Sequence, residues 1–180
     1  MKHTHESLCS TALMIGLCIL GFVVGFAIQP PQSITDQSSN MIQGMTPEEQ
    51  EAVDAKGTLI QFLLSLHEGR YADADKLYRG SYDLLLSWNA VDPKDHVQLW
   101  KNGCEMNGLN CLEIRNLDIA DHPNAETYMI NVWFSNNDGS EFSIPALNAD
   151  PNIPPQNMFL FMVTKTKTGF KVETMPPYSA

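Results

Sequence analysis

The chain has 180 residues, and its 21 acidic against 11 basic side chains give a formal net charge of −10. Phosphate backbones repel an acidic chain that has no basic stripe, so nucleic acid is a poor candidate partner. The same charge disfavours a domain that lies flat on anionic lipids.

One uncharged apolar stretch, from Leu8 to Ile28, precedes an otherwise ordinary acidic sequence. A helix over this stretch would be about 31 Å long at ~1.5 Å per residue, which matches a hydrocarbon core of ~30 Å. Lys2 precedes the stretch, and the next basic Lys or Arg after it is Lys56. The positive-inside rule therefore predicts a single-pass transmembrane helix in the lipid bilayer, with residues 1–7 as a cytoplasmic tail and the C-terminal part exported.

A secretory signal peptide is the alternative for the same stretch. Signal peptides have a positive first region, an apolar core of about 7–15 residues and a small-x-small cleavage site. Gly25 to Ala27 supplies such a site, but the apolar run is longer than the usual core. This length favours an uncleaved signal-anchor at the cell membrane. Secretion after cleavage near Ala27 stays open as the alternative localisation.

The exported part divides into a spacer and a domain. Residues 29–45 are polar, contain two prolines and lack apolar periodicity, which predicts a flexible spacer. Residues 46–178 have the length of one folded domain that buries about two thirds of its surface.

The first half of this domain has helical periodicity. Thr46 to Glu49 has the sequence of a capping box with Pro in the first turn, and it predicts a helix that ends near His67. A second helix is expected over residues 72–88 and a third from Asp92 to Gly103. The apolar positions at helical spacing in the first helix are Val53, Ile60, Leu63, Leu64 and His67.

After Cys111 the apolar period changes from that of a helix to that of a strand. Asn137 to Gly139 predicts a tight hairpin turn, and residues 145–157 form a proline-rich loop. The expected fold class is α+β, with helices packed on one side of a curved antiparallel sheet of four or five strands. The expected strands are 112–120, 127–135, 141–144, 158–165 and 170–174.

Two of these strands are apolar on both faces. Met158, Leu160 and Met162 alternate with a second apolar set, and Met129 and Trp133 point away from the inward face of their strand. A sheet that helices cover on one side should be polar on the other. The second face is therefore expected to be covered by the chain's own long loop or by a second copy, and we expect a homodimer through the sheet.

The four cysteines form two pairs. Cys9 and Cys18 belong to the apolar stretch, whereas Cys104 and Cys111 lie in the exported domain and bracket Glu105 to Asn110. In an oxidising compartment the second pair predicts a disulfide. A metal pair is the alternative, but it needs two further soft ligands that no spacing in this sequence supplies.

The segment from Phe62 to Ala74, an apolar helix followed by Gly-x-Tyr-x-x-Ala, resembles the nuclear transport factor 2-like (cystatin-like α+β cone) superfamily. Residues 104–115 and 154–161 look like an uncharacterised bacterial membrane-anchored branch, and the absence of Asn-x-Ser/Thr sequons fits a bacterial origin. The resemblance spans residues 46–178 and implies a cone-shaped domain. This fold carries isomerases, dehydratases and hydrolases as well as non-catalytic modules.

A ligand of such a cone would lie between the helices and the concave face of the sheet. The candidate pocket residues are Tyr78, Trp88, Asp95, His96 and Trp100. Adjacent helical residues such as Asp95 and His96 point about 100° apart, so they do not share one proton path. In the simpler interpretation Asp95 is the third residue of its helix, His96 is solvated, and the two tryptophans close the helical layer over the core.

We find no catalytic motif, no metal site and no cofactor site in this sequence. The expected protein is a membrane-anchored extracytoplasmic domain that acts as a non-enzymatic binding, dimerisation or envelope-assembly module, with an envelope protein as a further partner. The alternative is a small-molecule binder, or an isomerase or hydrolase that uses the cone cavity. Large side chains, including nine methionines, favour a filled cone and therefore the first hypothesis.

Overall fold

The computed structural model describes residues 44–146 and 152–179. Within these ranges no helix is long and apolar enough to cross a membrane. The predicted transmembrane stretch, residues 8–28, and most of the predicted spacer lie outside them.

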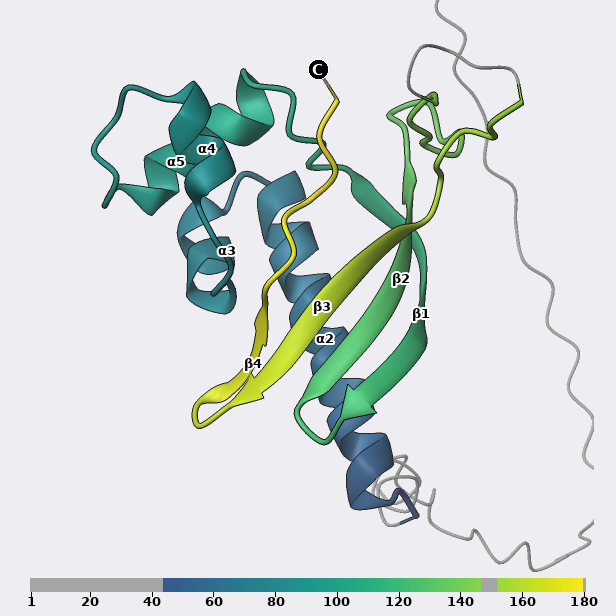
Figure 1. Cartoon of the computed structure of the whole chain (residues 1–180). Coiled ribbons are helices and arrows are strands. Elements are labelled where there is room, and N and C mark those ends of the chain that lie inside the picture. Colours follow the sequence, from purple (N-terminus) through teal and green to yellow (C-terminus); the bar gives the residue numbers. More distant parts are fainter. Residues whose placement is uncertain (1–43, 147–151, 180) are drawn as a thin grey trace, which may run out of the picture. The chain divides into compact units, whose positions relative to one another are not determined.

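Among the residues that the structure describes, four helices precede a four-stranded antiparallel sheet, which confirms the α+β class (Figure 1). The strands follow one another in the order β1-β2-β3-β4, and α2 contacts all four. The helices are α2 Pro47–His67, α3 Tyr71–Leu77, α4 Asp83–Trp88 and α5 His96–Glu105. The strands are β1 Glu113–Asn124, β2 Thr127–Ser135, β3 Phe159–Thr166 and β4 Gly169–Val172.

Local sequence determines both ends of α2. Glu49 Oε2 accepts from the Thr46 N–H at 2.7 Å, and Thr46 Oγ1 accepts from the Glu49 N–H at 3.2 Å. This is the predicted capping box, and Pro47 begins the helix. After His67 the chain turns at Gly69, whose φ of +72° favours glycine. Both predicted ends are confirmed.

The predicted apolar face of α2 was wrong in part. Val53, Ile60 and Leu64 are 50, 39 and 40% exposed, whereas Leu63 is buried. The predicted residues lie on two sides of the helix. The prediction considered only large apolar residues, whereas the buried face also includes an alanine and a serine. Its members are Ala55, Leu59, Phe62, Leu63, Ser65 and Leu66.

The predicted helix over residues 72–88 is two helices, α3 and α4. Tyr78 adopts an extended conformation after Leu77 and forms a parallel bridge with Val172 of β4. The Arg79 N–H then donates to the Val172 carbonyl oxygen at 2.9 Å. A long-range backbone contact with β4 therefore replaces the local helix at this point.

The third helix begins later than predicted. Asp92 to Asp95 is a turn in which the Asp95 N–H donates to the Asp92 carbonyl oxygen at 2.9 Å. Asp95 is the N-cap of α5, and its carboxylate accepts from the Gln98 N–H at 3.1 Å. The interpretation of Asp95 as the third residue of the helix was wrong, because the N-cap side chain is this aspartate and not Asp92.

The predicted strand 127–135 has the bounds of β2. Strand β1 continues to Asn124, with register shifts that the alternation of apolar residues does not reveal. The predicted strand 141–144 is absent: Glu141 and Ile144 form only isolated bridges, with Ser135 and Gln156. The predicted turn before it is present, and Gly139 has φ +80°.

The core lies between the helices and one face of the sheet. Along β2 every second residue is buried, and the same holds along the first half of β3. These strand residues pack with α2 and α5 into one apolar cluster that lies entirely within the compact unit Met41–Ala180. The largest fully buried side chains are Trp100, Tyr128, Phe62, Phe134 and Phe161.

The predicted pairing of the cysteines is confirmed, since the Cys104 and Cys111 sulfur atoms are 1.95 Å apart. The disulfide joins the last turn of α5 to the residues before β1.

Closing this loop should contribute about 2.5 kcal/mol to the free energy of unfolding on the chain-entropy model. We expect reductant to lower the urea midpoint of unit Met41–Ala180 accordingly. A Cys104→Ala/Cys111→Ala variant should not respond to reductant; an unchanged wild-type midpoint would contradict the prediction.

Candidate functional site

Three of the five predicted pocket residues meet between α2 and the later helices. Trp100 is fully buried, and its ring lies 5.0 Å from Tyr78 and 5.6 Å from Phe62 in edge contacts. His96 joins this group through Tyr82, on which it stacks with a centroid distance of 3.9 Å. The structure therefore brings Tyr78, His96 and Trp100 together.

Asp75 lies at the polar edge of this aromatic cluster and contacts both Tyr82 and His96. The Tyr82 hydroxyl donates to Asp75 Oδ1 at 2.5 Å, and His96 Nδ1 lies 3.2 Å from the same oxygen. One carboxylate thus fixes both the phenol and the imidazole ring. His96 thus contacts two side chains while its own side chain is 38% exposed.

Sequence reasoning missed Asp75 and Tyr82. In the helix predicted over residues 72–88 they would stand about 10.5 Å apart along the axis, too far for a hydrogen bond. They meet because the chain leaves the helix at Tyr78 and returns to it at Asp83. No periodicity in this sequence signals that break.

Burial keeps both phenols of the cluster protonated. Burial raises the pKa of Tyr78 to about 12, with a smaller contribution from the negative charge of Glu173. Burial also raises the pKa of Tyr82, and the hydrogen bond to Asp75 adds to this. The buried indole N–H of Trp100 lowers the pKa of Tyr82 by a smaller amount. This N–H makes no hydrogen bond of ordinary geometry. Tyr78 and Tyr82 therefore act as hydrogen-bond donors at neutral pH.

The raised pKa of Tyr78 predicts lower stability in alkali. Up to pH about 10 the phenol is protonated in both the folded and the unfolded chain. Between about 10 and about 12 only the unfolded chain loses the proton, so stability falls as pH rises. Urea unfolding across this range should show a smaller fall for Tyr78→Phe than for wild type. Tyr178→Phe, at an exposed position, should show the same fall in stability as the wild type. Equal curves of stability against pH for all three proteins would refute the assignment of the fall to Tyr78.

The other two predicted pocket residues lie elsewhere. Asp95 caps α5 and is exposed. Trp88 packs on Tyr178 near the C-terminus, with ring centroids 4.4 Å apart, and borders a hollow of about 490 Å³ with Met106 and Gly108. Trp88 packs against the edge of the hydrophobic core, and Asp95 directly precedes His96 at the start of α5.

A carboxylate that orients an imidazole is an arrangement that general bases use. The side chain of His96 is 38% exposed. The aromatic rings beneath it, however, fill the space between helices and sheet, and neither His96 nor Tyr82 borders the four cavities described for this structure. The cluster is packed as part of the core, and its rings contact one another.

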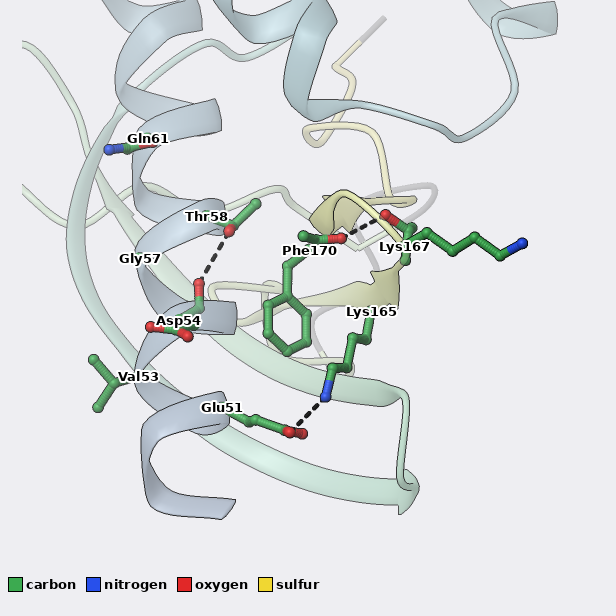
Figure 2. A pocket seen from close by; sticks show the side chains of 11 residues that line it. Glu51, Val53, Asp54, Gly57, Thr58, Gln61, Lys165, Lys167 and Phe170 are labelled. Carbon is green, nitrogen blue, oxygen red and sulfur yellow. Dashed lines mark hydrogen bonds and ion pairs between the residues drawn. The ribbon is translucent and has the colours of Figure 1, made fainter. Parts of the chain in front are cut away.

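The largest of these four cavities lies between α2 and the β3–β4 hairpin (Figure 2). It has a volume of about 750 Å³. Lys165 Nζ and Glu51 Oε1 form an ion pair of 2.5 Å across it, and Phe170 lies between helix and hairpin. On the helix side, the cavity is open beside Gly57, because a Cβ atom added there would meet no atom within 4 Å.

Apolar side chains also gather on the outer face of the sheet. Leu160 and Met158 are 46 and 44% exposed. Met162 pairs with Met129 across the β2–β3 ladder, and Trp133 follows on β2. We call these five residues the outer apolar patch. Met129, Trp133 and Met162 are half-buried, so the exposed part of the patch is Met158 and Leu160. Exposed apolar patches commonly mark protein interaction sites.

The comparisons with known proteins identify no relative: no family model, no curated protein and no solved structure matches this chain. Within the described ranges, moreover, no group of three or more His, Cys, Asp or Glu residues is placed to hold a metal ion.

Proposed function

We propose that this protein is a membrane-anchored extracytoplasmic module without enzymatic activity, and that it binds a second copy of itself through the outer apolar patch. We further propose that its domain is a cone of the nuclear transport factor 2-like superfamily. The order of elements supports this: a long helix and a Gly-x-Tyr-x-x-Ala helical turn precede an antiparallel sheet, and α2 crosses one face of that sheet.

The single observation that carries the proposal is the distribution of large apolar side chains over the two faces of the sheet. The inner face is filled, since Phe161, Ile130 and Val132 are fully buried. The outer face leaves Leu160 of β3 exposed, and Met158 is exposed just before this strand. A filled interior gives a substrate no space, whereas an exposed apolar face gains free energy when a partner covers it.

The location rests on the sequence and on the disulfide. The apolar stretch before the domain has the length of a membrane span, and the flanking charges favour a domain outside the cytoplasm. The Cys104–Cys111 pair agrees with an oxidising compartment. An anchor also confines the domains to one plane, which raises the effective concentration of a weakly associating pair.

Light scattering of unit Met41–Ala180 tests the self-association. This unit is compact and contains the whole described core. The measured mass should rise from that of one copy toward that of two as the concentration increases from micromolar to millimolar. A mass of one copy throughout would refute the proposal.

The Asp75–His96 pair favours a second candidate, a small-molecule binder or an isomerase or hydrolase. Native mass spectrometry of the purified unit separates this candidate from the first. A metabolite that co-purifies with the domain and is lost in His96→Gln would favour it, whereas a ligand-free mass supports the assembly module.

A further inference from the structure

The loop that the disulfide closes contacts a segment far away in the sequence. We call residues 104–111 the disulfide loop and residues 175–179 the held segment. Leu109 of the loop forms an antiparallel bridge with Tyr178 of the segment. The Tyr178 ring also packs on Trp88 of α4, with ring centroids 4.4 Å apart. The held segment therefore contacts both the disulfide loop and α4.

Backbone groups of the two segments pair directly. The Ser179 N–H donates to the Gly108 carbonyl oxygen at 3.1 Å, and the Asn110 N–H donates to the Pro177 carbonyl oxygen at 2.8 Å. At Gly108 the φ of +79° favours glycine, and an added Cβ atom would lie 2.5 Å from the Ser179 carbonyl oxygen. Glycine is therefore required where the loop and the held segment come closest.

The side chain of Asn110 adds three further hydrogen bonds to the held segment. Its Nδ2 donates to the Pro177 carbonyl oxygen at 3.0 Å and to Ser179 Oγ at 2.9 Å. In return the Ser179 hydroxyl donates to Asn110 Oδ1 at 3.2 Å. Asn110 directly precedes Cys111. The residue with most of the polar contacts to the segment is thus the one beside the disulfide.

Different interactions fix the middle and the end of the disulfide loop. Leu109, in the middle, is only 3% exposed, and its N–H donates to the Gly103 carbonyl oxygen at 3.0 Å. Just beyond Leu109 the disulfide holds the Cα atoms of the two cysteines 5.5 Å apart. Without the disulfide, the chain from Asn110 onward gains conformational entropy, which disfavours its ordered contacts. We therefore expect reduction to leave Leu109 in place and to loosen Asn110.

Both cysteines are half-buried, so the disulfide is not sealed in the core. We propose that the disulfide loop is a redox-sensitive switch: a dithiol reduces the disulfide, and residues 177–179 then separate from residues 108–110 and leave Trp88 exposed. In this exchange the Cys104–Cys111 bond breaks and the two sulfur atoms of the dithiol form a bond. Two electrons and two protons pass from the dithiol to the cysteines. This inference does not depend on the proposed self-association.

Fluorine NMR of the full chain, labelled with fluorotryptophan and kept in mild detergent, tests the switch with dithiothreitol as the dithiol. The chain has three tryptophans. Trp88 packs on the held segment, whereas Trp100 is buried in the core and Trp133 lies on β2. We expect reduction to move the Trp88 resonance, which Trp88→Phe identifies, and to leave the other two resonances in place.

Two outcomes of this experiment would overturn the proposal. The first is an unmoved Trp88 resonance after complete reduction, which the protein mass after alkylation of the thiols verifies. The second is movement of all three resonances, because this would show a general loosening of the domain and not release of the held segment. A Cys104→Ala/Cys111→Ala variant should show the Trp88 resonance at its reduced position, and a further response to dithiothreitol would contradict the role of this disulfide.

Asn110→Ala tests the contact itself while the disulfide stays oxidised. The variant loses the three side-chain hydrogen bonds to the held segment, so its Trp88 resonance should move toward the reduced position without reductant. The Trp100 resonance reports whether the core remains folded. Asn137→Ala, at the exposed turn before Gly139, is the matched control and should leave the Trp88 resonance in place. Equal Trp88 resonances in the two variants would contradict the proposed role of Asn110.

Discussion

Replacing Trp100 with alanine is expected to lower the free energy of unfolding by about 4 kcal/mol, near the upper end of the range for large-to-small core substitutions. Trp100 is fully buried and lies in edge contact with Phe62, Tyr78 and Tyr82. Its removal leaves a cavity between α2 and α5 that the rigid rings around it cannot collapse to fill. Urea unfolding of unit Met41–Ala180 measures the loss.

Trp88→Ala is the matched control for this prediction. Trp88 is only partly buried and packs mainly on the exposed Tyr178. Its replacement should lower the free energy of unfolding by less than half as much as the replacement of Trp100, because less apolar surface loses its contacts. Equal losses for the two variants would show that the aromatic cluster is not the centre of the core.

Replacing Leu160 with glutamate should raise the dissociation constant of the proposed dimer at least about 100-fold. Leu160 lies at the centre of the outer apolar patch, opposite Asn131 in the β2–β3 ladder. A dimer through this patch would bury two unpaired carboxylates, at a cost of about 3 kcal/mol or more. Sedimentation equilibrium of wild-type and variant unit Met41–Ala180 gives the two constants.

The folded copy itself should tolerate this change. Leu160 is 46% exposed, and exposed substitutions usually alter the free energy of unfolding by no more than about 0.5 kcal/mol. Val97→Glu introduces the same charge at an exposed apolar position of α5 and should leave the association unchanged. If both variants dissociate alike, net charge and not the patch controls the association.

The parts of the fold that the sequence predicts well are those with local causes. Helix α2 begins at a capping box, and β2 alternates buried and half-buried residues over its whole length. The errors arise where distant chain segments decide the structure. Tyr78 leaves its helix where it forms a bridge with Val172 of β4. The local signal of this break is Gly80, where a Cβ atom would lie 2.1 Å from the Glu173 carbonyl oxygen.

The candidate site was predictable in residue type but not in geometry. Tyr78, His96 and Trp100 were expected at the mouth of the cone that the family resemblance implies. The structure brings them together, with Tyr78 and Trp100 buried. Asp75 joins them only because the helix is interrupted, so its role depends on a long-range contact. The role of Asn110 was not predicted either, because its contacts with Pro177 and Ser179 join segments that are far apart in the sequence.

The most direct test of the proposed self-association is cross-linking between copies at Leu160. Unit Met41–Ala180 contains no cysteines besides the disulfide pair Cys104 and Cys111, so Leu160→Cys supplies a single free thiol at the outer apolar patch. A short bis-maleimide should join two copies of this variant efficiently and two copies of Val97→Cys slowly. Equal, slow cross-linking of both variants would contradict a sheet-to-sheet dimer.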